Sequence, residues 1–159
     1  MSFTPSPLRF GIIGLGMIAE FHAQALAQVQ GAQLTAVATR DAAKGQAFAA
    51  RHGVAFAGTS VEDLVRRDDV DAICITTSAG AHLEPARVAA QAGKHLVVEK
   101  PLEINLERTD ALLEAAESAG VQVGAIFQSR FGDGARTVKR ALHTGRLGRM
   151  VLASAAVKW

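Results

Sequence analysis

Short apolar runs alternate with longer amphipathic segments along most of the chain. The apolar runs are typical of strands buried in a sheet, and they occupy residues 8–13, 34–38, 72–77, 95–98 and 121–127. The segments with helical spacing are residues 17–29, 41–51, 61–65, 83–92, 106–119 and 135–143. Strands that alternate with helices indicate βαβ units, so we predict an α/β fold with a doubly wound parallel sheet (Rossmann type).

Composition and charge narrow the class of protein. The 159 residues are 49% hydrophobic and 20% charged, with a formal net charge of +2, and the basic residues look scattered, which argues against a nucleic-acid partner. The N-terminal segment lacks a signal-peptide core, and no run is apolar enough to span a membrane. We therefore expect a cytoplasmic protein. Cys74 is the only cysteine, so we expect a core residue, no disulfide and no metal site.

A glycine-rich turn follows the first predicted strand. In "GIIGLGMIAEFHA", Gly14, Gly16 and Ala19 form the pattern G-x-G-x-x-A. Gly14 allows a tight turn, Gly16 lets the backbone approach a pyrophosphate, and Ala19 lets the helix pack closely on the sheet. Met17 and Ile18 begin that helix, whose free N–H groups favour phosphates. This setting predicts a dinucleotide site, and the alternative is a turn needed only for packing.

The end of the second strand bears on the choice of dinucleotide. An acidic residue about 20 positions after the glycines would bind the ribose of NAD, but Thr39 and Arg40 stand there. A guanidinium without a carboxylate fits a ribose 2′-phosphate, so the cofactor is NADP or NAD with a lean to NADP. Asp41 could still reach the ribose, or it could cap the next helix.

Three segments together resemble one family. They are "GIIGLGMIAEFHAQAL", "DAICITTSAGAHLEPARVAAQAGKHLVVEKPLE" and "GVQVGAIFQSRF", and they are similar to the Gfo/Idh/MocA oxidoreductases. The resemblance implies an NAD(P)-binding Rossmann domain over residues 1–128. Residues 129–159 would then be a connector helix and the first strand, "MVLASAAV", of a truncated domain for substrate binding and oligomerisation. The complete protein would be a homo-oligomer.

The element Glu99-Lys100-Pro101 is the most specific part of the resemblance. It implies that Lys100 reaches the nicotinamide and the substrate, and that a cis peptide bond before Pro101 fixes its direction. Glu99 would orient the lysine or meet the cofactor. An ammonium can stabilise a developing alkoxide, and a neutral lysine could take the proton. The residues alone leave a solvated Glu–Lys pair equally open.

The resemblance also implies that the segment after the third strong strand passes under the cofactor. This segment contains Thr76, Thr77 and Ser78. Ser78 stands where the family usually has a proline, and its hydroxyl could donate a hydrogen bond. His82 matches a family histidine near the cofactor, and a solvent-facing histidine at a helix start is the alternative.

Several other positions have expected roles. Gln128 would meet the nicotinamide carboxamide, and Arg130 would meet an anionic substrate or pair with a carboxylate. Lys158 and Trp159 would line the pocket entrance of a complete enzyme. We expect His22, on the first helix, to be structural.

Two functions are compatible with these features. The resemblance implies an NAD(P)-dependent oxidoreductase that acts by hydride transfer on a hydroxyl of a sugar, polyol or nucleotide sugar. The alternative is a non-catalytic dinucleotide-binding module for redox sensing or partner binding, because the fold serves both classes. Glu99-Lys100-Pro101 favours the enzyme, while we expect residues 1–159 alone to be inactive.

Overall fold

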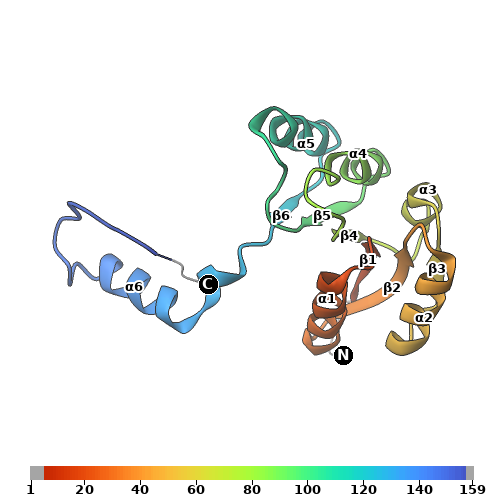
Figure 1. Cartoon of the computed structure of the whole chain (residues 1–159), viewed down its shortest axis with the longest axis horizontal. Helices are drawn as coiled ribbons and strands as arrows, with labels where there is room; N and C mark the ends of the chain where they lie inside the picture. The colour runs from red at the N-terminus through yellow and green to blue at the C-terminus, as the bar shows by residue number, and fades with distance from the viewer. Residues whose placement is uncertain (1–5, 157–159) are drawn as a thin grey trace, which may run out of the picture. The chain divides into compact units, whose positions relative to one another are not determined.

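Six parallel strands form one sheet in the computed structural model, which describes residues 6–156 (Figure 1). The strands are β1 (Leu8–Ile13), β2 (Ala32–Ala38), β3 (Phe56–Gly58), β4 (Ala72–Ile75), β5 (His95–Val98) and β6 (Val123–Ala125). Their spatial order is β3-β2-β1-β4-β5-β6, so the chain winds outward from β1 in both directions. This is the doubly wound order of dinucleotide-binding folds, and it confirms the predicted fold class.

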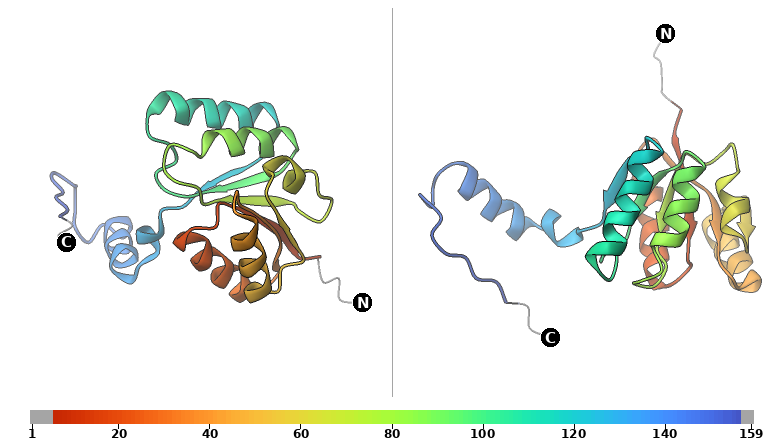
Figure 2. Two further views of the ribbon diagram at one scale, coloured as in Figure 1. Left: turned by 45° about the vertical axis from the view of Figure 1, so that its right-hand side comes forward. Right: turned by 90° about the horizontal axis from the view of Figure 1, so that it is seen from above.

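Helices cover both faces of the sheet (Figure 2). One face packs against α1 (Met17–Gln28) and α2 (Ala42–His52), and the core there includes Ile12, Val37 and Phe48. The other face packs against α3 (Val61–Val65), α4 (Leu83–Gln91) and α5 (Leu106–Ser118). Within residues 6–156, no helix has the length and apolar character needed to cross a membrane.

Local sequence signals explain where the helices begin and end. Asp41 precedes α2 and its Oδ1 accepts a hydrogen bond from the Lys44 N–H at 3.0 Å. Gly53 ends the same helix with a φ of 64°, a left-handed conformation that glycine adopts without strain. Asn105 caps α5 in the same way as Asp41 caps α2. The interpretation of Asp41 as a helix cap is therefore confirmed.

The structure differs from the predicted elements at several boundaries. The edge strand β3 was not predicted, because its three residues, "FAG", are too few to show a period. The strand predicted at 72–77 ends at Ile75, and the hydroxyl of the next residue, Thr76, bonds to the backbone carbonyls of Ile13 and Gly14. The strand predicted at 121–127 shortens to β6.

Residues 127–156 belong to a second unit, separate from residues 6–126. It contains the short 3-10 helix η1 (Gln128–Phe131) and α6 (Asp133–His143), and none of these 30 residues is buried. The strand predicted over "MVLASAAV" does not form within residues 150–156. A strand needs a partner for its backbone groups, and no other strand lies in this unit to supply one.

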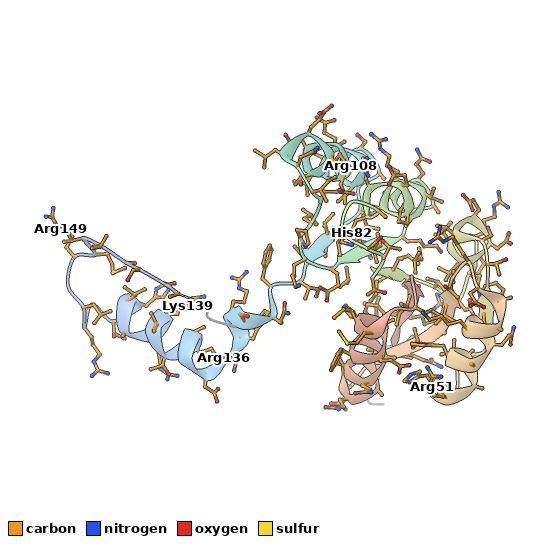
Figure 3. The ribbon with its side chains drawn as sticks, in the orientation of Figure 1. Arg51, His82, Arg108, Arg136, Lys139 and Arg149 are labelled. Atoms are coloured by element: carbon orange, nitrogen blue, oxygen red, sulfur yellow. The ribbon has the colours of Figure 1, made fainter. Side chains whose placement is uncertain are left out.

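The basic residues are not scattered as the sequence seemed to indicate. Residues 127–159 contain seven of the 17 lysines and arginines but only one of the 15 acidic residues. Figure 3 labels three of them in the second unit, Arg136, Lys139 and Arg149. The chain therefore joins an acidic first unit to a basic second one.

The buried face of β4 gives a direct test of the fold. Ile73 is fully buried in the core beneath α3 and α4, so Ile73→Ala should lower the free energy of unfolding by about 2–5 kcal/mol through the cavity it leaves. Val138→Ala on the exposed α6 should change it by less than about 0.5 kcal/mol. Urea unfolding followed by circular dichroism measures both, and equal effects of the two changes would contradict this core.

Candidate dinucleotide-binding site

The carboxyl ends of neighbouring strands lie level with one another. Ile13 of β1 pairs with Ala38 of β2 and Ile75 of β4, and Ile75 pairs with Val98 of β5. The residues that follow these strand ends therefore meet along one edge of the sheet, where ligands bind in open parallel sheets. They include most of the residues that the sequence singled out: Gly14, Gly16, Thr39, Arg40, Thr76, Thr77, Ser78, Glu99 and Lys100.

The two glycines of the turn after β1 serve different purposes. Gly14 has a φ of +89°, and a Cβ there would lie 2.8 Å from the backbone nitrogen of Thr77. Gly16, at the start of α1, has an extended conformation, and a Cβ there would contact nothing within 4 Å. The fold therefore requires glycine at position 14 but not at position 16. The free space at Gly16 is what a pyrophosphate lying against the backbone would need.

A cavity of about 580 Å³ opens at this edge of the sheet. Its size suits a cofactor or a small-molecule ligand. The predicted residues that line it are Gly14, Gly16, Thr39, Arg40, Thr76, Thr77 and Ser78. A neighbouring cavity of about 310 Å³ is lined by Met17, and Ile18 lines neither cavity.

Lys44 is a cavity residue that the sequence reasoning missed. It lies in the first turn of α2 and lines both cavities. Arg40 precedes the helix cap Asp41, and both Arg40 and Lys44 line the larger cavity. The position of Lys44 in the first turn of the helix that follows the second strand was the signal that could have identified it.

Threonine hydroxyls fasten the loop after β4 to its surroundings. Thr76 Oγ1 donates to the carbonyl oxygen of Gly14 at 2.6 Å, and Thr77 Oγ1 donates to that of Ala81 at 2.7 Å. Both hydroxyls therefore stabilise the wall of the cavity, and their hydrogens are not free for a ligand. Ser78 lies in the same wall.

Glu99 is buried at the end of β5 and holds two groups. Its Oε1 lies 3.0 Å from Nε2 of His22 on α1, and its Oε2 accepts a hydrogen bond from the Lys100 N–H at 3.0 Å. The peptide bond between Lys100 and Pro101 is cis, and Lys100 is exposed. Neither Glu99 nor Lys100 lines the larger cavity, although they follow the adjacent strand. His22 thus contacts the motif that contains Lys100, a contact that the sequence did not reveal.

Cys74 lies on β4 behind this edge. Burial and, secondarily, the charge of Glu99 raise the pKa of its thiol to about 12. A thiol that stays protonated is a poor nucleophile. The interpretation of Cys74 as a core residue is confirmed, since only 2% of its surface is exposed.

His82 is buried, so the alternative of a solvent-facing histidine is wrong. Its ring lies between the loop after β4 and the loop after β5, with backbone carbonyls on both sides. Figure 3 shows it on the α4–α5 side of the sheet, as it does Arg108. The sequence predicted that His82 belongs near the cofactor, but its polar ring atoms face protein groups.

Glu103 connects the loop after β5 to the start of α4. Its Oε1 accepts hydrogen bonds from the N–H groups of His82 and Leu83, at 3.1 and 2.9 Å. Arg108 of α5 pairs with Glu103 and with Glu84 of α4. The hydrogen bond from Arg108 is the main reason that the pKa of Glu103 falls to about 2. Glu103 is therefore an anion at every physiological pH.

Gln128 and Arg130 lie in η1 of the second unit. Both are exposed, and the Arg130 guanidinium lies 5.8 Å from the ring centroid of Phe131. Their roles at the nicotinamide and the substrate stay predictions. Lys158 and Trp159 lie outside the described residues.

Comparisons with known proteins point to one group of enzymes. A family model described as an oxidoreductase family with an NAD-binding Rossmann fold, GFO_IDH_MocA, matches residues 8–127. The chain is 34% identical to 1,5-anhydro-D-fructose reductase of Ensifer adhaerens, covering 91% of this chain and 44% of that protein. It is 32% identical to the scyllo-inositol 2-dehydrogenase (NADP(+)) of Bacillus subtilis, covering 86% and 42%.

A solved structure of a dehydrogenase has the same fold as this chain. The scyllo-inositol dehydrogenase of Lactobacillus casei, crystallised with NAD(H) and scyllo-inositol, superposes with a TM-score of 0.83 at 30% identity. The superposition covers 90% of this chain and 43% of that one. The chain thus spans less than half the length of each of these three proteins.

The two glycines provide a matched pair of changes. Gly16→Val should leave the unfolding temperature nearly unchanged, because a Cβ there contacts no protein atom within 4 Å, but it should abolish saturable binding of NADPH and NADH. Gly14→Val should lower the unfolding temperature as well, because its side chain meets Thr77. Fluorescence titration and thermal unfolding measure the two effects. Unchanged dinucleotide binding by Gly16→Val would refute the site.

Proposed function

Because the chain belongs to the Gfo/Idh/MocA oxidoreductase family, whose model matches residues 8–127, we propose that it forms the cofactor-binding part of an NAD(P)-dependent dehydrogenase. Membership confirms the resemblance seen in the sequence. The proposed substrates are sugars, polyols or nucleotide sugars, because the first two are named for its relatives and a related dehydrogenase was crystallised with UDP-GlcNAcA. The observation that carries the proposal is the glycine turn, where space left free at Gly16 adjoins the 580 Å³ cavity.

The cofactor would lie along the carboxyl edge of the sheet. The turn from Gly14 to Ile18 would bind its pyrophosphate through backbone N–H groups at the start of α1. Thr39, Arg40 and Lys44 would bind the adenosine ribose, and the wall from Thr76 to Ser78 would support the remainder. When bound, the nicotinamide supplies or accepts the hydride.

Lys100 would handle the proton of the substrate hydroxyl. It follows β5 at the same edge as the glycine turn, and its backbone N–H is held by the buried carboxylate of Glu99. The ammonium group of an exposed lysine at this edge can stabilise a developing alkoxide or exchange a proton with the hydroxyl. His22 would act behind Glu99 by fixing the position of its carboxylate.

A preference for NADP over NAD is part of this proposal. Arg40 and Lys44 are two cations on one cavity, and the strand end at Thr39 lacks the carboxylate that would bind two free ribose hydroxyls. Both NADP(+) and NAD(H) occur in the names of relatives, so the family alone does not decide.

Arg40→Ala and Lys44→Ala should each weaken NADPH binding by about 1–3 kcal/mol, roughly five- to 150-fold, because each removes a charged donor to the 2′-phosphate. The same changes should weaken NADH binding by less than about threefold. Arg87→Ala, at an exposed position of α4, is the matched control. Isothermal titration calorimetry measures the dinucleotide affinity of the unsubstituted chain and of the three variants. A preference for NADH that survives both cavity substitutions would disprove the proposed preference for NADP.

Lys100→Met keeps most of the bulk of the side chain and removes its charge. In residues 1–159 it should leave NADPH affinity within about twofold. In a polypeptide that also carries a substrate domain, it should lower turnover by ~10²-fold or more. Lys100→Arg keeps a cation that does not release a proton, so its turnover separates electrostatic stabilisation from proton transfer. The absorbance of the reduced nicotinamide reports turnover, and full activity of Lys100→Met would contradict the proposed role.

A further inference from the structure

The ring of His82 is surrounded by hydrogen-bond acceptors. Its Nδ1 lies 3.0 Å from the carbonyl oxygen of Pro101 and 3.2 Å from that of Leu102. Its Nε2, on the opposite side of the ring, lies 3.1 Å from the carbonyl oxygen of Thr77. Carbonyl oxygens only accept hydrogen bonds, so each ring nitrogen requires a proton to form one.

A neutral imidazole cannot satisfy this arrangement. It carries one N–H, so the other nitrogen would direct its lone pair at a carbonyl lone pair about 3 Å away. Water cannot relieve the conflict readily, because only 1% of the His82 surface is exposed. An imidazolium donates from both nitrogens and satisfies both sides of the ring.

We propose that His82 is an imidazolium that joins the loop after β4 to the loop after β5 and thereby positions Lys100. Pro101 and Leu102 directly follow Lys100, and Thr77 belongs to the wall of the 580 Å³ cavity. The two hydrogen bonds thus span the segment that carries the lysine and the segment that lines the proposed cofactor site. The role toward Lys100 rests on the proposed function, whereas the charge of the ring does not.

The ionised side chains that pair with one another next to His82 bear on its charge. They come from the loop after β5, from α4 and from α5: Glu103, Glu84 and Arg108. The buried Glu103 carboxylate is the charge that favours a cation here, because the Glu84 side chain is 64% exposed and water screens its charge. Glu103 also accepts the backbone N–H of His82 itself.

Two effects oppose the cation. His82 stands at the N-terminal end of α4, where the helix dipole disfavours positive charge, and burial disfavours any charge. Glu103 offsets the first effect because its carboxylate accepts the first N–H groups of that helix. Hydrogen bonds donated by a charged group are stronger than the dipole effect, and here the ring donates on both sides.

Ring-nitrogen NMR of the ¹⁵N-histidine-labelled chain tests the charge directly. The chain has five histidines, and His82→Gln assigns the signal. At about pH 7.5, where an ordinary histidine is mostly neutral, both His82 nitrogens should be bonded to slowly exchanging protons. A neutral His82 ring with one protonated nitrogen would overturn the proposal.

Hydrogen exchange tests the connection between the loops. In His82→Gln, amides of residues 77–83 and of residues 102–104 should both exchange about tenfold faster or more, while β1 stays protected. His143→Gln should change neither segment. Faster exchange confined to the start of α4 would show that His82 only supports the helix and would refute the connection. Should β1 also lose protection, the substitution has unfolded the domain, and the ring spectrum of the unsubstituted chain decides.

The role toward Lys100 requires a polypeptide capable of turnover. His82→Gln should there lower kcat about tenfold or more, while KM for the dinucleotide changes less than about threefold. A loss of dinucleotide affinity with unchanged kcat would contradict the positioning role. If residues 1–159 bind no dinucleotide, the proposed function fails. The ring-nitrogen spectrum does not depend on that binding, so failure of the proposed function can be distinguished from failure of the proposed imidazolium.

Discussion

The parallel alignment of the strands is the constraint on which the site depends. Because Ala38, Ile13, Ile75 and Val98 stand level in the sheet, residues far apart in the sequence leave the sheet at the same edge. The backbone ladder fixes this edge, and the buried cores on both faces keep the ladder intact. Gly16 of the glycine turn and Lys100 lie 84 positions apart in the chain, yet one edge presents both.

Side chains then fasten the loops that emerge at this edge to one another. Thr76 ties the loop after β4 to the glycine turn, and Gly14 permits their close approach. The contact between His22 and Glu99 ties the loop after β5 to α1. His82 joins the loops after β4 and β5 through backbone carbonyls. A site held in this way is preorganised, so less binding free energy is spent on ordering it when the cofactor binds.

Features that depend on local sequence could be predicted, and features that depend on side-chain contacts across the fold could not. The apolar runs and the glycine pattern located most strands and the turn, because burial and backbone geometry leave a periodic trace. Asp41 was interpreted correctly as a helix cap, since capping acts over three residues. The contact between His22 and Glu99 joins residues 77 positions apart, and nothing in the local sequence marks it. The burial of His82 was missed because polar residues at a helix start usually face water, and here Glu103 covers that start.

The central claim, that this edge of the sheet binds a dinucleotide, is tested most directly by backbone-amide NMR of residues 1–159 titrated with NADP(+). The account predicts that the largest shifts fall on the turn from Gly14 to Ile18, on Thr39 to Lys44 and on Thr76 to Ser78, with smaller shifts near Lys100. Amides at the opposite ends of the strands, such as those of Leu8 and Ala72, should not move. Shifts centred on those opposite ends, or saturation without any change in the glycine turn, would contradict the account.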